Sequence, residues 1–125
     1  MNFPQLAPNV WKLGVIDWDR RLFDALIPLP DGTSYNAYLV KGSDKTALLD
    51  TVDLDMPEKI LEQLESIDRI DYVIAHHAEQ DHSGSIGPVI AKYPDSVVVC
   101  STKCKPFLID HLHIDENRIC AMDDD

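Results

Sequence analysis

Basic residues are scarce in this 125-residue sequence, which has 11 Lys and Arg against 22 Asp and Glu and a formal net charge of -11. Nucleic-acid backbones and anionic lipid surfaces attract cationic proteins, so neither is expected as a partner. No apolar run approaches the ~20 residues that a membrane-spanning helix needs. The start, Met1 to Pro4, lacks the basic and apolar regions of a signal peptide. We therefore expect a cytoplasmic protein.

Cysteine is also rare, with only Cys100, Cys104 and Cys120 in the chain. An odd number of cysteines without an export signal favours reduced thiols over a disulfide framework. The spacing of Cys100 and Cys104 could suggest a zinc knuckle, but a second Cys or His pair at suitable spacing is missing. We interpret these two cysteines as small buried hydrophobic residues.

Hydrophobic residues make up 45% of the chain, enough for the core of one globular unit over residues 1–125. Short β-branched runs predict strands, and the runs between them have helical periodicity. The expected strands are Val10 to Ile16, a hairpin of Tyr35 to Val40 with Thr46 to Leu49, Tyr72 to Ala75, and Val97 to Cys100. The last of these is expected to be buried on both faces. A loop from Asp17 to Gly32 separates the first two strands.

Three helices are expected between and after these strands. The first begins near Asp55 and Pro57, the second covers Ser85 to Ala91, and the third is capped by Thr102 and runs to about His111. Strands that alternate with helices predict an α/β fold with mostly parallel strands.

The most informative segment is the loop His76-His77-Ala78-Glu79-Gln80-Asp81-His82-Ser83-Gly84 at the end of a predicted strand. It places four possible metal ligands, His77, Glu79, Asp81 and His82, within six residues. In an extended segment, His77, Glu79 and Asp81 would point to the same side, and His82 would turn to a neighbouring position. Sites in α/β proteins commonly lie at the carboxyl ends of strands.

Two imidazoles and two carboxylates without a thiolate suit iron, manganese or zinc, and the carboxylates favour iron or manganese. The alternative is a solvated acidic loop with scattered histidines, which is less consistent with four possible ligands so close together. His76 falls on the opposite side of an extended chain from His77, so we expect it to pack or to form hydrogen bonds.

The loop resembles the His-x-Glu-x-Asp-His motif of flavodiiron proteins, in which Glu replaces the second His of the metallo-β-lactamase pattern. The segments from Asp17 to Phe23, from Asp31 to Leu39 and from Ala47 to Thr51 resemble the same family. This resemblance implies the N-terminal half of a metallo-β-lactamase-like αββα sandwich, with a mixed sheet and helices on one face. It further implies that His77 and Glu79 bind one iron and that Asp81 and His82 bind the other.

Asp50 resembles an acid beside the metal loop in this superfamily, where it could orient a ligand imidazole through the nitrogen not bound to metal. A turn residue at a strand end is the alternative. The family completes its site with a His, a bridging carboxylate and another His further along the chain. His111 and His113 resemble a helix end and turn instead, and the acidic end from Met122 to Asp125 is expected to be frayed.

The resemblance implies a parent activity of oxygen or nitric oxide reduction, with a di-iron site and electrons from flavin mononucleotide in a flavodoxin-like domain. That domain and the second half of the sandwich are missing from these residues, so flavin mononucleotide is not expected to bind. We expect a fragment or a shortened relative that is inactive alone. A non-enzymatic module and a zinc hydrolase fragment remain alternatives, and an uncovered apolar sheet face predicts a homodimer.

Overall fold

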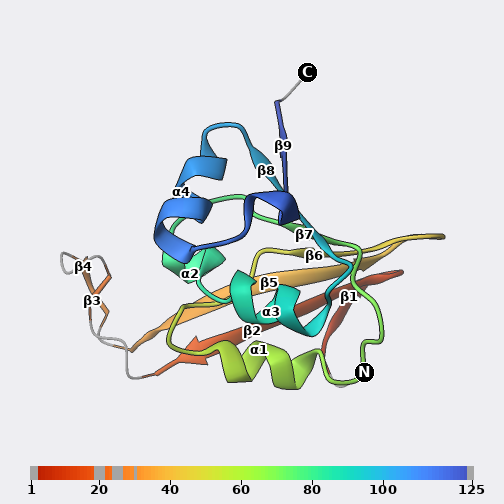
Figure 1. Ribbon diagram of the computed structural model, residues 1–125. Coiled ribbons are helices and arrows are strands. Elements are labelled where there is room, and N and C mark those ends of the chain that lie inside the picture. Colours follow the sequence, from red (N-terminus) through yellow and green to blue (C-terminus); the bar gives the residue numbers. More distant parts are fainter. Residues whose placement is uncertain (1–2, 19–21, 24–26, 30, 124–125) are drawn as a thin grey trace.

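The computed structural model describes residues 3–18, 22–23, 27–29 and 31–123. Asp19, Arg20 and Arg21 of the predicted loop, and Asp124 and Asp125 of the acidic end, lie outside the described residues. Seven strands form one mixed sheet in the order β1-β2-β5-β6-β7-β8-β9, and β3 pairs with β4 separately (Figure 1). The strands of the sheet are β1 (Gln5–Ala7), β2 (Val10–Asp17), β5 (Thr33–Lys41), β6 (Thr46–Leu49), β7 (Tyr72–Ile74), β8 (Val97–Ser101) and β9 (Ile119–Met122).

The sheet changes character at β6. Strands β1, β2, β5 and β6 pair antiparallel, whereas β6, β7, β8 and β9 pair parallel. The expected hairpin and the strands in β2, β7 and β8 are confirmed, and the α/β class with a mixed sheet is confirmed. The expectation of mostly parallel strands is wrong, because half of the pairings in this sheet are antiparallel. The short strands β1, β9, β3 (Leu22–Phe23) and β4 (Ile27–Pro28) have no counterpart in the sequence prediction. Runs of two to four residues carry too little periodicity to be detected.

The helices are α1 (Pro57–Gln63), α2 (Gln80–Ser83), α3 (Ile86–Lys92) and α4 (Cys104–Leu112), and a 3-10 turn η1 covers Glu116–Arg118. Pro57 occupies the first turn of α1 as expected. The predicted cap of α4 is wrong, because Ser101 Oγ accepts the Cys104 N–H while Thr102 donates to Asp123. Among the helices of the described chain, none is long and apolar enough to cross a membrane.

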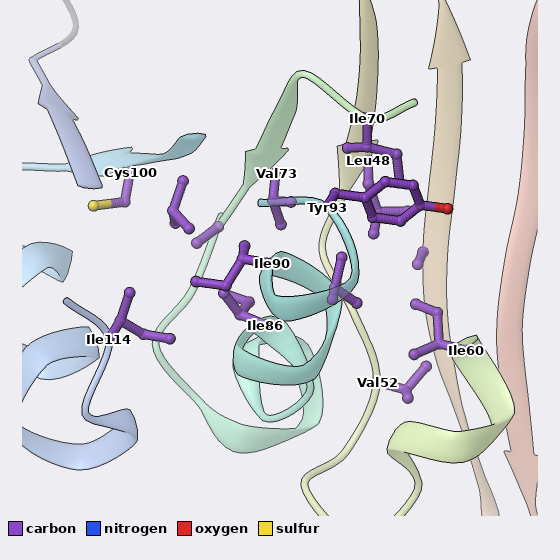
Figure 2. Packing of buried hydrophobic residues seen from close by; sticks show 14 of the residues in the cluster. Leu48, Val52, Ile60, Ile70, Val73, Ile86, Ile90, Tyr93, Cys100 and Ile114 are labelled. Atoms are coloured by element: carbon purple, nitrogen blue, oxygen red, sulfur yellow. The ribbon is translucent and has the colours of Figure 1, made fainter. Parts of the chain in front are cut away.

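The core lies between the sheet and helices α1, α3 and α4. Leu39, Leu48, Val73 and Val98 occupy one row across four neighbouring strands, and none is more than 1% exposed. Figure 2 shows residues of this core around α3, among them Ile86 and Ile90 of the helix itself. Figure 1 shows the helices gathered on this side of the sheet.

On the opposite face of the sheet, the part across β5 to β8 is apolar but only half-buried, whereas Lys12, Ser34 and Asn36 on β2 and β5 are polar and exposed. The central row of the apolar part joins Tyr38, Leu49, Ile74 and Val99 across β5 to β8. The prediction that β8 is buried on both faces is wrong, because Val97 and Val99 on this open face are only partly buried. An unbroken apolar run such as Val97 to Cys100 does not reveal how well each face is covered.

Candidate metal-binding loop

The loop after β7 is extended only over its first half. Glu79 is the N-cap of α2, so Asp81 and His82 lie in a short helix and not on an extended chain. The buried Ser83 hydroxyl donates to the carbonyls of Ala78 and Glu79, which closes this turn. The expected alternation of His77, Glu79 and Asp81 on one side is therefore wrong beyond Glu79. A helix of four residues is too short to show a 3.6-residue pattern.

Asp50 lies at the centre of the polar contacts in this region. It follows β6 with a φ of 62°, a backbone conformation uncommon for a residue other than glycine. Its Oδ1 accepts the backbone N–H of His76 at 2.9 Å, and its Oδ2 lies 3.1 Å from His76 Nδ1. The same Oδ2 lies 3.3 Å from His82 Nδ1. One carboxylate thus faces two imidazoles, and the expected hydrogen-bonding role of His76 is confirmed.

The ring of His82 lies close to two other predicted ligands. Its Nε2 lies 3.6 Å from Asp81 Oδ2, and its centroid lies 5.0 Å from that of the His77 ring. Asp81 and His82 are half-buried, whereas His77 and Glu79 are exposed. The structure brings His77, Asp81 and His82 together beside Asp50 and leaves Glu79 at the start of α2. In the part of the chain described, no group of three or more His, Cys, Asp or Glu side chains is arranged to hold a metal ion.

The backbone of His82 is held by a residue that the sequence argument did not single out. Both the N–H and the hydroxyl of Thr51 donate to the His82 carbonyl, each at 2.8 Å. Thr51 and Ser85 are fully buried, and the Ser85 N–H donates to Thr51 Oγ1 at 3.3 Å. Thr51 directly follows Asp50 in the segment from Ala47 to Thr51 that resembles the family, and this position is the sequence signal that points to it.

Gly84 lets the loop approach the segment after β6. A Cβ at this position would lie 2.3 Å from the backbone nitrogen of Leu54 and 2.4 Å from the carbonyl oxygen of Gln80. No larger residue fits here without a backbone shift. The segment from Asp50 to Leu54 and the segment from His82 to Ser85 are thus packed against each other along the backbone.

The remaining candidates lie in ordinary structural positions. His111 is on α4 with its ring stacked on Phe107, and His113 is the C-cap of that helix with a φ of 56°.

Cys100 and Cys104 are buried free thiols, as expected. Burial raises the pKa of Cys100 to about 11 and also raises the pKa of Cys104. Both thiols therefore stay protonated at neutral pH, unlike the thiolates that bind metals.

The described residues of the loop do not form a group of three ligands around one point, but two of their features are compatible with a metal ion. His82 Nδ1 is buried without a hydrogen bond of good geometry, although the Asp50 carboxylate is 3.3 Å away. A small rotation of the ring would pair Nδ1 with Asp50 and leave Nε2 beside Asp81 for a ligand. The donor set of imidazoles and carboxylates also suits iron and manganese.

The comparisons with known proteins identify the family. Residues 33–125 match the model described as ODP family beta lactamase. The chain belongs to this family. It is 38% identical to the flavo-diiron protein FprA2 of Clostridium acetobutylicum, covering 83% of this chain and 26% of that protein. It is 34% identical to a nitric oxide reductase of Moorella thermoacetica, covering 90% of this chain and 29% of the relative.

Solved structures of flavodiiron proteins have the same fold as this ODP-family chain. The flavodiiron protein of Giardia intestinalis superimposes with a TM-score of 0.89 at 27% identity, over 99% of this chain and 31% of that one. Rubredoxin oxygen:oxidoreductase from Desulfovibrio gigas gives a TM-score of 0.88 at 28% identity, over 97% of this chain and 31% of its own. The resemblance to a flavodiiron metallo-β-lactamase-like domain is confirmed. The chain spans less than a third of the length of each of these four proteins.

Proposed function

We propose that the loop after β7 binds divalent metal, iron in its natural setting, through His77, Glu79, Asp81 and His82. The observation that carries this proposal is the grouping of His82 with Asp81 and Asp50 at 3.6 Å and 3.3 Å. Asp50 would hold the His82 ring through Nδ1, so that Nε2 and the Asp81 carboxylate face the same ion. By resemblance, His77 and Glu79 serve one iron, and Asp81 and His82 serve the other.

The parent activity that we propose is reduction of oxygen or nitric oxide, supported by relatives named nitric oxide reductase and rubredoxin oxygen:oxidoreductase. A bound iron pair would supply the electrons for that reduction. This chain's own residues contribute ligands and orient one imidazole. Four candidate ligands make an incomplete di-iron site, so we propose that the chain alone is inactive. We also propose that this chain does not bind flavin mononucleotide. A cytoplasmic setting fits the three free cysteines.

An anaerobic titration with Fe²⁺ tests the metal site. We expect the wild-type chain to bind the ion and a His77→Ala, His82→Ala double variant to bind at least ~10-fold more weakly. A His111→Ala, His113→Ala double variant is the matched control, because it removes two histidines outside the loop, and it should bind like the wild type. Equal binding by all three proteins would show that the loop is not the site and would favour a non-enzymatic module.

Activity measurements address the second part of the proposal. With reductant supplied and flavin absent, we expect no oxygen or nitric oxide consumption above the background given by free Fe²⁺. Turnover at rates typical of enzymes, ~1–1000 per second, would contradict the proposed inactivity. Ester or amide hydrolysis by the zinc-loaded chain would favour the zinc hydrolase alternative instead.

We also propose a homodimer formed through the open face of the sheet. The half-buried row of Tyr38, Leu49, Ile74 and Val99 continues into exposed residues such as Tyr72, which makes one apolar surface. Surfaces of this kind in soluble proteins usually mark interfaces, and a two-fold contact would cover both copies. Light scattering over a dilution series should show a dimer that a Leu49→Lys, Val99→Lys variant loses. A wild-type chain that stays monomeric at micromolar concentration would refute the dimer.

A further inference from the structure

Thr51 is a buried side chain that reaches from the segment after β6 to the backbone of a proposed ligand. Its hydroxyl and its N–H both donate to the His82 carbonyl at 2.8 Å. The side chain is completely buried, so water does not compete for these bonds. Thr51 therefore determines where the His82 backbone lies relative to β6.

His82 is thus restrained at two points by consecutive residues. Thr51 holds its backbone carbonyl, and Asp50 lies 3.3 Å from its ring nitrogen Nδ1. Asp50 has a positive φ, and the side chains of Asp50 and Thr51 both contact the segment from His76 to His82. The carbonyl is fixed by two hydrogen bonds, whereas Nδ1 lies close to Asp50 without a hydrogen bond of good geometry. The position of the backbone therefore decides whether the ring can pair with Asp50 and direct Nε2 toward an ion.

We infer that Thr51 is a positioning residue for the metal site, which orients His82 toward the ion and thereby raises affinity. This inference rests on the proposed function, because it requires that His82 binds metal. The hydroxyl does not touch the ion. Its effect operates through the His82 backbone, so it should appear in affinity and in coordination geometry and not only in the stability of the fold.

The test compares three variants for Co²⁺ affinity, the visible spectrum of bound Co²⁺, and the free energy of unfolding without metal. Thr51→Val removes the hydroxyl but keeps the β-branched shape and the backbone bond to His82. Thr51→Ser restores a hydroxyl at the same place. Ser85→Ala is the matched control, because its buried hydroxyl donates to the Asp53 carbonyl in the same pair of segments and does not contact His82.

We expect Thr51→Val to bind Co²⁺ ~10-fold more weakly and with a changed spectrum, as is typical when an outer-shell partner of a ligand is lost. Thr51→Ser should stay close to the wild type in both. Ser85→Ala should lose stability but keep its affinity within about twofold and its spectrum unchanged, because it leaves the ligand backbone in place.

Two results would overturn the inference. One is Thr51→Val binding Co²⁺ like the wild type with the same spectrum. The other is Ser85→Ala weakening binding as much as Thr51→Val, which would mean that any loss of stability in this region has the same effect. Failure of the proposed function is a distinct result, because the wild-type chain would then not bind Co²⁺, or the His77→Ala, His82→Ala variant would bind it equally well.

Discussion

The covered face of the sheet and the candidate metal-binding loop at its edge are held in place by different forces. On the covered face, aliphatic side chains such as Leu48, Val73 and Val98 are fully buried against the helices. In the loop, hydroxyls, a carboxylate and a glycine fix the chain through directional contacts. Burial tolerates small adjustments of position, whereas a ligand must be placed within a fraction of an ångström. The core therefore stabilises the fold, and the directional contacts in the loop determine where its side chains lie.

The largest difference in the free energy of unfolding is expected between alanine variants of two neighbouring leucines of β6, whose side chains point to opposite faces of the sheet. Leu48 is 0% exposed, so Leu48→Ala should lower the free energy of unfolding by about 2–5 kcal/mol. Leu49 on the open face is half-buried, so Leu49→Ala should cost about 1 kcal/mol or less in the monomer. Urea unfolding at low protein concentration measures both. Equal losses would mean that the open face is covered as well as the other.

The next effect distinguishes two glycines that lie three residues apart. Gly84→Ala forces a Cβ against the backbone of Leu54 and should cost about 1–3 kcal/mol, with a parallel loss of metal affinity. Gly87 in α3 has nothing within 4 Å of the added Cβ, so Gly87→Ala should stabilise the helix by about 0.5–1 kcal/mol. Thermal and urea unfolding of the two variants check the sign of each change. A stabilised Gly84→Ala would show that the two segments do not pack closely.

The Asp50→Asn variant should separate the effect of Asp50 on the orientation of the His82 ring from its effect on the stability of the fold. Asn tolerates a positive φ and its carbonyl can still accept the His76 N–H, so the fold should lose little stability. It lacks the negative charge that the proposed function assigns to orienting the His82 ring, and the affinity for Fe²⁺ should fall ~10-fold. Calorimetric titration gives the affinity, and Asp71→Asn at the opposite end of the strands serves as the control. Unchanged affinity in Asp50→Asn would assign Asp50 to the turn alone.

The smallest effect concerns the carboxylate of Asp71, which lies before β7. The Thr46 N–H donates to this carboxylate at 2.8 Å and holds its pKa below the ordinary 3.8, and the neighbouring Arg69 adds to the effect. A lowered pKa in the folded state adds stability above pH 3.8, and this stability is lost as the pH falls through the lower folded-state value. Asp71→Asn should therefore flatten the acid limb of the stability curve. An identical acid limb in variant and wild type would contradict this role.

Much of the fold was predictable because long elements carry strong patterns. The strands β2 and β5 and helix α3 follow from β-branched runs and spaced apolar residues. The short strands at both edges, and the helix α2 inside the loop, were missed because two to four residues show no period. The secondary structure of such short segments depends on specific contacts, such as the hydrogen bonds from the Ser83 hydroxyl that close the turn of α2.

For the site, the sequence predicted which residue types gather and which family they resemble. The choice of His77, Glu79, Asp81 and His82 depended on their chemistry and spacing, and it stays a prediction of ligation. Their geometry was not predictable, because an extended chain was assumed where a helix forms. Thr51 was overlooked as a functional candidate because a threonine has no ligand chemistry of its own.

The sequence by itself determined the acidic character of the chain, the alternation of strands and helices, and the ligand types in the loop. These are local properties, since each depends on residues that are neighbours along the chain. Only the tertiary structure decided that Asp50 faces both His76 and His82, and that Thr51 holds the backbone of a residue 31 positions away. These contacts exist because β6 and β7 pair in parallel. Parallel pairing brings both carboxyl ends to one edge of the sheet, where side chains distant in sequence can meet.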